Sequence, residues 1–318
     1  MNHTILVTGA AGFAGSHLLD LLEPGSAPVV PWRRPGEPFP PGRTGDELPW
    51  MSVELLDRDA VSAAIAHVRP AAVFHLAGAA HVGQSWNRTR DTLAANVLAT
   101  NHLLGALRGA GLRPRVLVTG SALVYQPSAA ALREDDPLGP SNPYGLSKLA
   151  QELLGRRAAI DDGLPVIVAR PFNHVGPRQH PSFFTSSFAR QIALIEAGRS
   201  EAVIRVGNLD ARRDLTDVRD TVRAYRALIE RGRPGEVYNV CSGHGYRVGD
   251  ILDRLLARAR VPIRVHVDAA LYRPNDTPLI AGSWQRIHEE TGWAPRIPID
   301  RTLDDLLDHW RAACAAAP

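Results

Sequence analysis

Short apolar runs alternate with helix-like patterns through the first half of the chain. Residues 5–8 (ILVT) are apolar, and a helical pattern runs from about 12 to 22. Later strand-like runs are APVVPW, MSVELL, AAVFHLAG and RVLVTGS, with a second helical pattern near 60–67. Strands joined by helices build a parallel sheet covered on both faces. The pattern predicts a doubly wound α/β fold, with its ligand crevice at the carboxyl ends of the strands.

The alternation becomes irregular after the apolar run LPVIVARPF. Short strands at AVIRV, EVYNV and IRVHV lie between helices, which indicates a smaller α/β lobe over the crevice. We therefore expect a Rossmann-type cofactor-binding domain over residues 1–169 and a smaller substrate-binding domain over 170–318. The segment of about 214–242 is expected to return to the first domain. A Pro/Gly-rich stretch at 35–49 reads as an irregular surface excursion, and we assign no chemistry to it.

Composition narrows the possible partners. The 36 Lys and Arg are scattered among 33 Asp and Glu, for a formal charge of +3, so no basic run indicates a nucleic-acid surface. Cys241 and Cys314 are far apart and lack metal-ligand spacing, so we expect neither a disulfide nor a metal site. The N-terminal residues lack a signal-peptide layout, and no apolar stretch is long enough to span a bilayer. We expect a cytoplasmic protein without membrane partners.

Three glycines mark the first strand-to-helix junction. Gly9, Gly12 and Gly15 form a G-x-x-G-x-x-G pattern, which lets backbone N–H groups and a helix N-terminus approach a pyrophosphate. A purely structural tight turn is the alternative. The segment His75 to Gly78 ends another strand with small residues, where backbone can pass close to a ligand; His75 itself is expected to pack at the strand end.

The second strand should end near the adenosine ribose of a dinucleotide. A carboxylate there would hydrogen-bond the 2′-hydroxyl of NAD, whereas this chain has Trp32, Arg33 and Arg34. Guanidinium groups suit a 2′-phosphate, so the sequence favours NADP(H). A solvated arginine pair at the start of a loop is the alternative.

Three polar residues supply candidate chemistry. Tyr144 and Lys148 are four residues apart at the start of a predicted helix and therefore share one face. A nearby ammonium is expected to lower the tyrosine pKa, which would make Tyr144 a usable proton donor or acceptor. Ser121 follows the strand RVLVTG, where its hydroxyl can reach the same substrate oxygen.

The motifs GAAGFAG, HLAG, SALVY and YGLSK, in this order, resemble those of the extended short-chain dehydrogenase/reductases, over nearly the whole chain. The resemblance implies a catalytic triad of Ser121, Tyr144 and Lys148, supported by Asn96. It also implies an adenine contact by Glu54 and Leu55, although the family more often has Asp where Glu54 stands, and a homodimer formed through two helices of the first domain. By position, the remaining cofactor-binding residues are Gly9, Gly12, Phe13, Gly15, Arg33, Arg34, Leu76, Ala77, Gly78, Tyr144, Lys148 and Pro171.

The second half carries candidate substrate ligands. Arg213 and Arg273 each follow a strand-like segment and suit a diphosphate, since guanidinium forks match phosphate oxygens. Ion pairs with Asp214 and Asp276 are the alternative. Asn173 and His174 follow the strand VIVAR and can hydrogen-bond sugar or phosphate, although a capping or packing role for His174 stays open.

The stretches RPFNHVGPRQ and VGNLDARRDLTDV are most similar to those of the GDP-mannose branch, particularly the GDP-4-keto-6-deoxymannose reductases. This resemblance implies reduction of the C4 ketone of a GDP-4-keto-6-deoxyhexose by NADPH. Ala122 and Leu123 stand where 4,6-dehydratases carry a carboxylate, and neither can move a proton. The reductases usually have acidic residues at Leu123 and Val124, and SALVY instead resembles the 4-epimerase motif. An NAD-dependent nucleotide-sugar 4-epimerase and a non-catalytic NADP-binding sensor are the alternatives.

Overall fold

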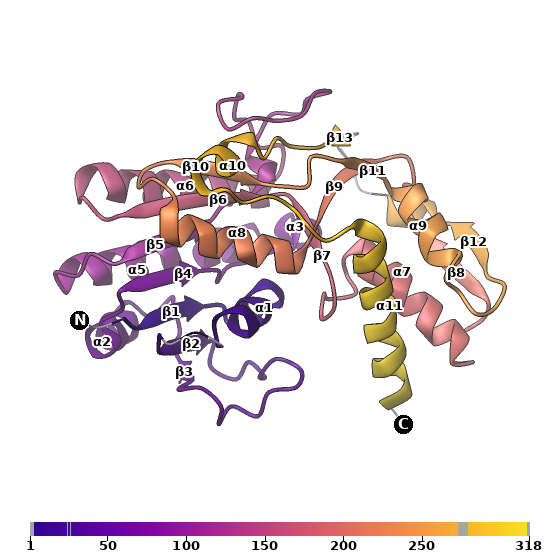
Figure 1. Ribbon diagram of the computed structural model, residues 1–318, viewed down its shortest axis with the longest axis horizontal. Coiled ribbons are helices and arrows are strands. Elements are labelled where there is room, and N and C mark those ends of the chain that lie inside the picture. Colours follow the sequence, from indigo (N-terminus) through magenta and orange to yellow (C-terminus); the bar gives the residue numbers. More distant parts are fainter. Residues whose placement is uncertain (1–2, 24, 26, 273–278, 317–318) are drawn as a thin grey trace.

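The predicted strands of the first half pair into one parallel sheet. This computed structural model describes residues 3–23, 25, 27–272 and 279–316 (Figure 1). The seven-stranded sheet has the order β10-β6-β5-β4-β1-β2-β3. Because β1 lies between β2 and β4, the chain order reverses there, and a crevice opens beyond the carboxyl ends of these strands. The strands are β1 (Ile5–Thr8), β2 (Val29–Arg33), β3 (Met51–Ser52), β4 (Ala72–His75), β5 (Arg115–Thr119), β6 (Val166–Pro171) and β10 (Val237–Val240).

Helices cover both faces of this sheet because successive strand residues are buried on opposite sides. In β1, Val7 faces one core and Leu6 the other. The first face packs against α1 (Phe13–Leu22), α8 (Val218–Arg231) and α10 (Gln285–Thr291). The second packs against α2 (Arg58–Val68), α5 (Ala99–Gly109) and α6 (Pro143–Asp161), and the short α3 (Val82–Ser85), α4 (Thr89–Leu93) and the π-helical turn η1 (Ala94–Leu98) lead into α5.

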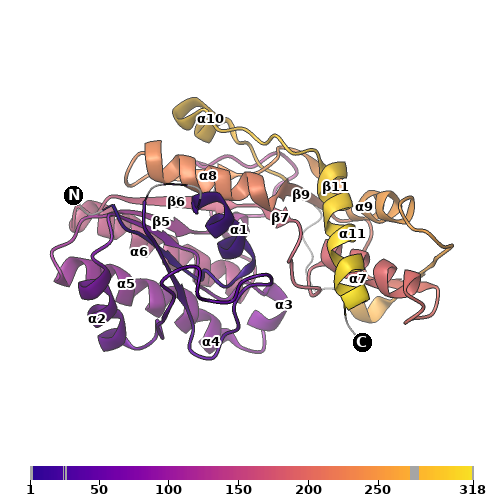
Figure 2. The same cartoon turned by 60° about the horizontal axis from the view of Figure 1, so that its bottom comes forward.

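A smaller lobe lies beside the carboxyl edge of the large sheet (Figure 2). Its core joins Phe188 and Ile192 of one helix to Ile251 and Leu303 of two others. A four-stranded sheet contains β7 (Asn173–Val175), β9 (Arg212–Asp217), β11 (Gly245–Arg247) and β13 (Leu279–Ile280), and β8 (Val203–Val206) pairs with β12 (Arg264–Val267). The helices are α7 (Phe184–Glu196), α9 (Val248–Leu256) and α11 (Ile299–Ala316), and a 3₁₀ turn, η3 (Ala269–Leu271), follows β12.

The structure departs from the expected elements at two places. The run MSVELL was predicted as a strand, but β3 ends at Ser52 because the chain turns there: the Glu54 carboxylate accepts a hydrogen bond from the Leu56 nitrogen at 3.0 Å. Residues 285–291, placed in the smaller lobe by the sequence, form α10, which packs on α8 and β10 of the large lobe. Within the described ranges, no helix has the length and apolar character needed to cross a membrane.

Candidate functional site

The glycine turn joins β1 to α1. Gly9 follows β1 with a φ of +66°, a left-handed conformation that favours glycine. A Cβ there would lie 2.6 Å from the backbone nitrogen of Ala77, so the turn passes directly against the segment after β4. Gly12 is the N-cap of α1, and no side chain of the described residues caps this helix. Its first N–H groups therefore suit a pyrophosphate.

Arginines stand at the carboxyl end of β2. Arg33 is the last residue of the strand and is half-buried, whereas Arg34 is exposed. Glu54 and Leu55, the predicted adenine contacts, follow β3: Glu54 turns its carboxylate toward its own backbone, and the Leu55 carbonyl accepts a hydrogen bond from His102 Nδ1 at 3.0 Å. The carboxyl end of β2 thus presents the guanidinium groups of Arg33 and Arg34 where a 2′-phosphate is expected.

Ser121, Tyr144 and Lys148 come together where β5 ends and α6 begins. Ser121 is the N-cap of a 3₁₀ turn, η2 (Ala122–Val124), and its Oγ accepts a hydrogen bond from the Leu123 nitrogen at 3.2 Å. Tyr144, in the first turn of α6, is hydrogen-bonded to Ser121. Lys148 Nζ donates to the Thr119 carbonyl at 2.9 Å. The helix start therefore brings the phenol and the ammonium to the end of the strand.

Asn96 ties two parts of this site together. It lies in η1, where its Oδ1 accepts a hydrogen bond from the Ala79 nitrogen at 2.8 Å. Its Nδ2 donates to Ser147 Oγ, also at 2.8 Å, on the helix that carries Lys148. The segment of Leu76, Ala77 and Gly78 directly precedes this contact, and Pro171 ends β6 at the same sheet edge. Asn96 thus fixes the loop after β4 against α6.

The smaller lobe places its candidate residues on two neighbouring strands. Asn173 is exposed and His174 is half-buried on β7, which pairs with β9. Arg213 follows the predicted strand-like run AVIRV, which forms β8, and itself lies within β9; its Nη1 donates to the Arg212 carbonyl at 2.8 Å. Arg273 and its alternative partner Asp276 lie outside the described residues.

Asp214, the alternative ion-pair partner of Arg213, is buried and organises neighbouring backbone. Its carboxylate accepts hydrogen bonds from the nitrogen and the hydroxyl of Ser242, both at 2.7 Å, and from the Gly243 nitrogen at 2.9 Å. Burial raises the pKa of Asp214, and these hydrogen bonds oppose that shift. Asp214 therefore anchors the connection between β10 and β11.

A family model described as GDP-mannose 4,6 dehydratase matches residues 6–306. The chain belongs to this family. It is 36% identical to the GDP-6-deoxy-D-mannose reductase of Pseudomonas aeruginosa, over 98% of both chains. It is also 28% identical to the UDP-glucose 4-epimerase of Mus musculus, over 96% of this chain and 95% of that one.

Solved structures of similar proteins share the whole fold of this family member. RMD from Pseudomonas aeruginosa, complexed with NADPH, matches with a TM-score of 0.85 and 34% identity, over 98% of this chain and 99% of that one. A putative epimerase from Burkholderia cenocepacia J2315 matches with a TM-score of 0.87 and 35% identity, over 98% of both chains. Family membership confirms the predicted Rossmann-type fold and the prediction of a nicotinamide-dependent oxidoreductase.

The tyrosine of this family site has a raised pKa. Burial raises the pKa of Tyr144, and the hydrogen bond with Ser121 opposes the shift. The expectation that Lys148 lowers this pKa was wrong. The ammonium lies 6.0 Å from the centroid of the tyrosine ring and donates to Thr119 and Gln151, and burial lowers its own pKa to about 8. At neutral pH Tyr144 is therefore a phenol, which can donate a proton.

A buried hydrogen-bond chain that sequence reasoning missed extends from Lys148. The ammonium donates to Gln151 Oε1 at 2.9 Å, and Gln151 Nε2 donates to Thr100 Oγ1 at 2.8 Å. Thr100 then contacts His75 Nε2, and His75 Nδ1 contacts Thr8 Oγ1, each at 2.8 Å. Burial and the Lys148 charge lower the pKa of His75 to about 3, so His75 packs as a neutral ring, as expected. The spacing of Gln151, three residues after Lys148 on one helix, is the signal that could have revealed the chain.

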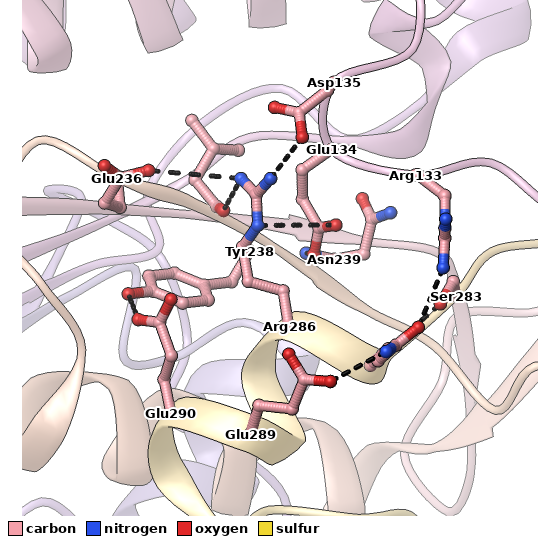
Figure 3. Close-up of polar contacts among 12 residues, drawn as sticks. Arg133, Glu134, Asp135, Glu236, Tyr238, Asn239, Ser283, Arg286, Glu289 and Glu290 are labelled. Carbon is pink, nitrogen blue, oxygen red and sulfur yellow. Dashed lines mark hydrogen bonds and ion pairs between the residues drawn. The ribbon is translucent and has the colours of Figure 1, made fainter.

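A polar cluster holds one wall of the site. Figure 3 shows Arg286 of α10 pointing at Asp135, Glu134 and Glu236, with its closest contact to Asp135 at 2.5 Å. The Leu132 backbone also pairs with Ala281 and Ser283, next to β13. Leu132 and two residues of β13, Leu279 and Ile280, border a small hollow beside η2, which Ala122 and Leu123 line on the other side. The cluster thus fixes an apolar wall next to Ser121.

Proposed function

We propose that the protein uses NADPH to reduce the C4 ketone of a GDP-4-keto-6-deoxyhexose to a GDP-6-deoxyhexose of the mannose or rhamnose type. One observation carries the proposal: the turn after Ser121 contains only Ala122, Leu123 and Val124, so Tyr144 is the proton-transferring group beside Ser121. Ketone reduction needs one hydride and one proton. Elimination of water across C5 and C6 needs a further base and acid, which these side chains do not supply.

In this mechanism each residue of the triad has one task. NADPH, when bound, supplies the hydride. Ser121 donates a hydrogen bond that orients the C4 carbonyl, and Tyr144 gives its proton to the developing alkoxide oxygen. Its raised pKa suits this role because the phenol keeps its proton at neutral pH. Lys148 would hold the hydroxyls of the nicotinamide ribose, while Asn96 supports the neighbouring loop.

The choice of NADP(H) rests on the corner at the end of β2. Arg33 and Arg34 occupy the position where a carboxylate would recognise NAD, and RMD, the 34% identical relative, is complexed with NADPH. The uncapped N-terminus of α1 offers the pyrophosphate site. We assign the cofactor to Gly9, Gly12, Phe13, Gly15, Arg33, Arg34, Glu54, Leu55, Leu76, Ala77, Gly78, Tyr144, Lys148 and Pro171.

The nucleotide sugar is assigned to the smaller lobe. We assign binding of the diphosphate to two arginines. One is Arg213 of β9, and the other is Arg273, which lies outside the described residues. Asn173 and His174 of β7 are proposed to contact the sugar or a phosphate. The 36% identical GDP-6-deoxy-D-mannose reductase supports GDP as the carrier.

An NAD-dependent 4-epimerase is the second candidate, favoured by the SALVY motif and by 28% identity to a UDP-glucose 4-epimerase. An epimerase consumes no added NADPH, because the reduced cofactor returns its hydride inside the site. The deciding experiment mixes the protein with NADPH and GDP-4-keto-6-deoxymannose, and in parallel with GDP-mannose and UDP-glucose. We expect one NADPH oxidised per 4-keto sugar reduced and no conversion of the other two. Epimerisation without cofactor oxidation would support the second candidate, and cofactor binding without any turnover would support the sensor.

We further propose that the protein is a cytoplasmic homodimer. Leu146, Leu153 and Ile160 recur every seven residues along α6, and each is about half or more exposed. Leu98 of the neighbouring η1 is likewise 51% exposed. An apolar stripe on a surface helix marks a surface that a second copy can cover.

A further inference from the structure

The segment between β2 and β3 packs against the large lobe. We call residues 35–50 the specificity loop. This loop connects the parallel strands β2 and β3 in place of a crossover helix, and it runs beneath α1 in Figure 1. Leu48 and Trp50 pack against the core on the α1 face. Arg43, whose side chain is only 7% exposed, donates to Asp20 at 2.8 Å and to both carboxylate oxygens of Glu23 at 2.5 and 2.8 Å. The loop is therefore docked on α1 by an ion-pair cluster and by apolar contacts.

This docking holds one aromatic ring beneath Arg33. The guanidinium carbon of Arg33 lies 4.5 Å from the centroid of the Phe39 ring. Trp50 meets the same ring edge-on, with centroids 5.3 Å apart. Gly45, with a φ of +94°, closes over the ring so tightly that a Cβ would lie 2.4 Å from Phe39 Cζ. Phe39 is thus fixed by its own loop and presents a face to the guanidinium.

The hydrogen-bonding capacity of Arg33 is only partly used by the protein. One Nη donates to the Glu37 carbonyl, and the Nε is buried without a partner among the described residues. The Glu37 carboxylate accepts a hydrogen bond from the backbone nitrogen of Arg34 at 3.0 Å, so the hydrogen bond that the Arg33 guanidinium donates among the described residues goes to a carbonyl and not to a carboxylate. A positioned guanidinium without a counter-ion suits an added anion.

We propose that the specificity loop holds Arg33 in place for the 2′-phosphate of NADPH, with Phe39 as the positioning residue. This inference rests on the proposed use of NADPH. Because Phe39 acts through the guanidinium, its ring face matters only for ligands that carry the 2′-phosphate. A general scaffold role would affect NADH and NADPH alike.

The test compares dissociation constants for NADPH and NADH, measured by fluorescence titration. Phe39→Leu keeps apolar volume but removes the aromatic face, and the matched control Pro38→Ala alters an exposed neighbour in the same loop. We expect Phe39→Leu to weaken NADPH binding about three- to tenfold and to leave NADH binding unchanged. Pro38→Ala should retain the wild-type preference for NADPH. Adding Phe39→Leu to Arg33→Ala should cause no further loss.

Each failure points to a different claim. Should Arg33→Ala leave the preference for NADPH intact, the arginine-phosphate contact of the proposed function is wrong. Should Arg33→Ala abolish the preference while Phe39→Leu keeps it, the positioning role is overturned and the proposed function stands. An equal loss of NADH and NADPH affinity in a folded Phe39→Leu protein likewise overturns the positioning role.

Discussion

Phe13, the first residue of α1, stacks on His174 of β7 with ring centroids 5.6 Å apart and planes within 10° of parallel. Phe13 belongs to the glycine turn of the large lobe, whereas His174 belongs to the smaller lobe. The glycine turn of the large lobe and β7 of the smaller lobe thus touch directly at this pair. Burial lowers the pKa of His174, so the ring is neutral near pH 7.

His174→Ala is expected to lower the free energy of unfolding by about 0.5 to 1.5 kcal/mol, because it removes an aromatic pair. His174→Phe keeps the stacking surface and should restore most of that stability. Urea unfolding of both variants measures the difference. Equal destabilisation by Ala and Phe would show that the imidazole nitrogens, and not the stack, are responsible.

Tyr144→Phe should lower turnover about a hundredfold or more, since general acid catalysis contributes on that order. NADPH binding should stay nearly unchanged, because the change removes only a hydroxyl. Ser121→Ala, the matched control that removes only an orienting hydroxyl, should lower turnover by a smaller factor. Steady-state kinetics with NADPH and the 4-keto sugar, together with cofactor titration, check both. Near-normal turnover by the Phe variant would mean that another group donates the proton.

Gln151 is expected to set the alkaline limit of activity through Lys148. The folded pKa of Lys148 is about 8, so the protonated ammonium and the activity that needs it decline as the pH rises through that value. Gln151→Met removes an acceptor of the ammonium and should move this limb to lower pH, whereas Gln151→Glu adds a negative charge and should move it higher. The pH dependence of kcat/KM measures the shift. A limb at the same pH in all three proteins contradicts this positioning role.

The sequence predicted the features that depend on local residue pattern, and those that lie at the carboxyl edge of the parallel sheet. The glycine turn and the strand of Ser121 were predicted because short apolar runs and turns identify them. The carboxyl ends of parallel strands meet, and this places Ser121 near the helix of Tyr144.

Features that depend on tertiary contacts were not predictable in this way. The strand β9 reads as charged (RRDLTD), and its buried Asp214 is stabilised by Ser242 and Gly243, which are distant in sequence. The sign of the Tyr144 shift depends on how deeply the ring is buried and on where Lys148 points. Likewise, the loop at 35–49 reads as irregular because its contacts with Arg33 and α1 leave no periodic pattern.

His17 should make the folded protein sensitive to mild acid. Burial, together with the charge of Arg178, lowers its pKa to about 4 from a usual 6.5. Between these values the unfolded chain binds a proton that the folded chain excludes, so the free energy of unfolding falls as the pH drops below about 6.5. From pH 6.5 to 5 this loss of unfolding free energy is about 1.5 kcal/mol. His17→Gln should reduce the fall in unfolding free energy at acid pH by that amount, as measured by urea unfolding at several pH values. An unchanged pH dependence would contradict this prediction.

The proposed dimer predicts a matched pair of surface variants. The wild-type protein should sediment as a dimer in analytical ultracentrifugation. Leu153→Asp, on the apolar stripe of α6, should dissociate it because a carboxylate cannot be buried there without a partner. Leu271→Asp, at an equally exposed leucine of the smaller lobe, should remain dimeric. A monomeric wild-type protein, or a dimeric Leu153→Asp protein, would exclude this interface.

The chain passes between the two lobes at the connections β6 to β7, β9 to α8, β10 to β11, β13 to α10 and α10 to α11. The smaller lobe is therefore not one contiguous stretch of coding sequence, and a single recombination event cannot exchange it whole between relatives. The specificity loop, by contrast, is contiguous with Arg33. Preference for a cofactor can thus be inherited or transplanted as one contiguous segment that includes α1, on which the loop docks. Preference for a sugar has to evolve through separate substitutions in segments scattered along the gene.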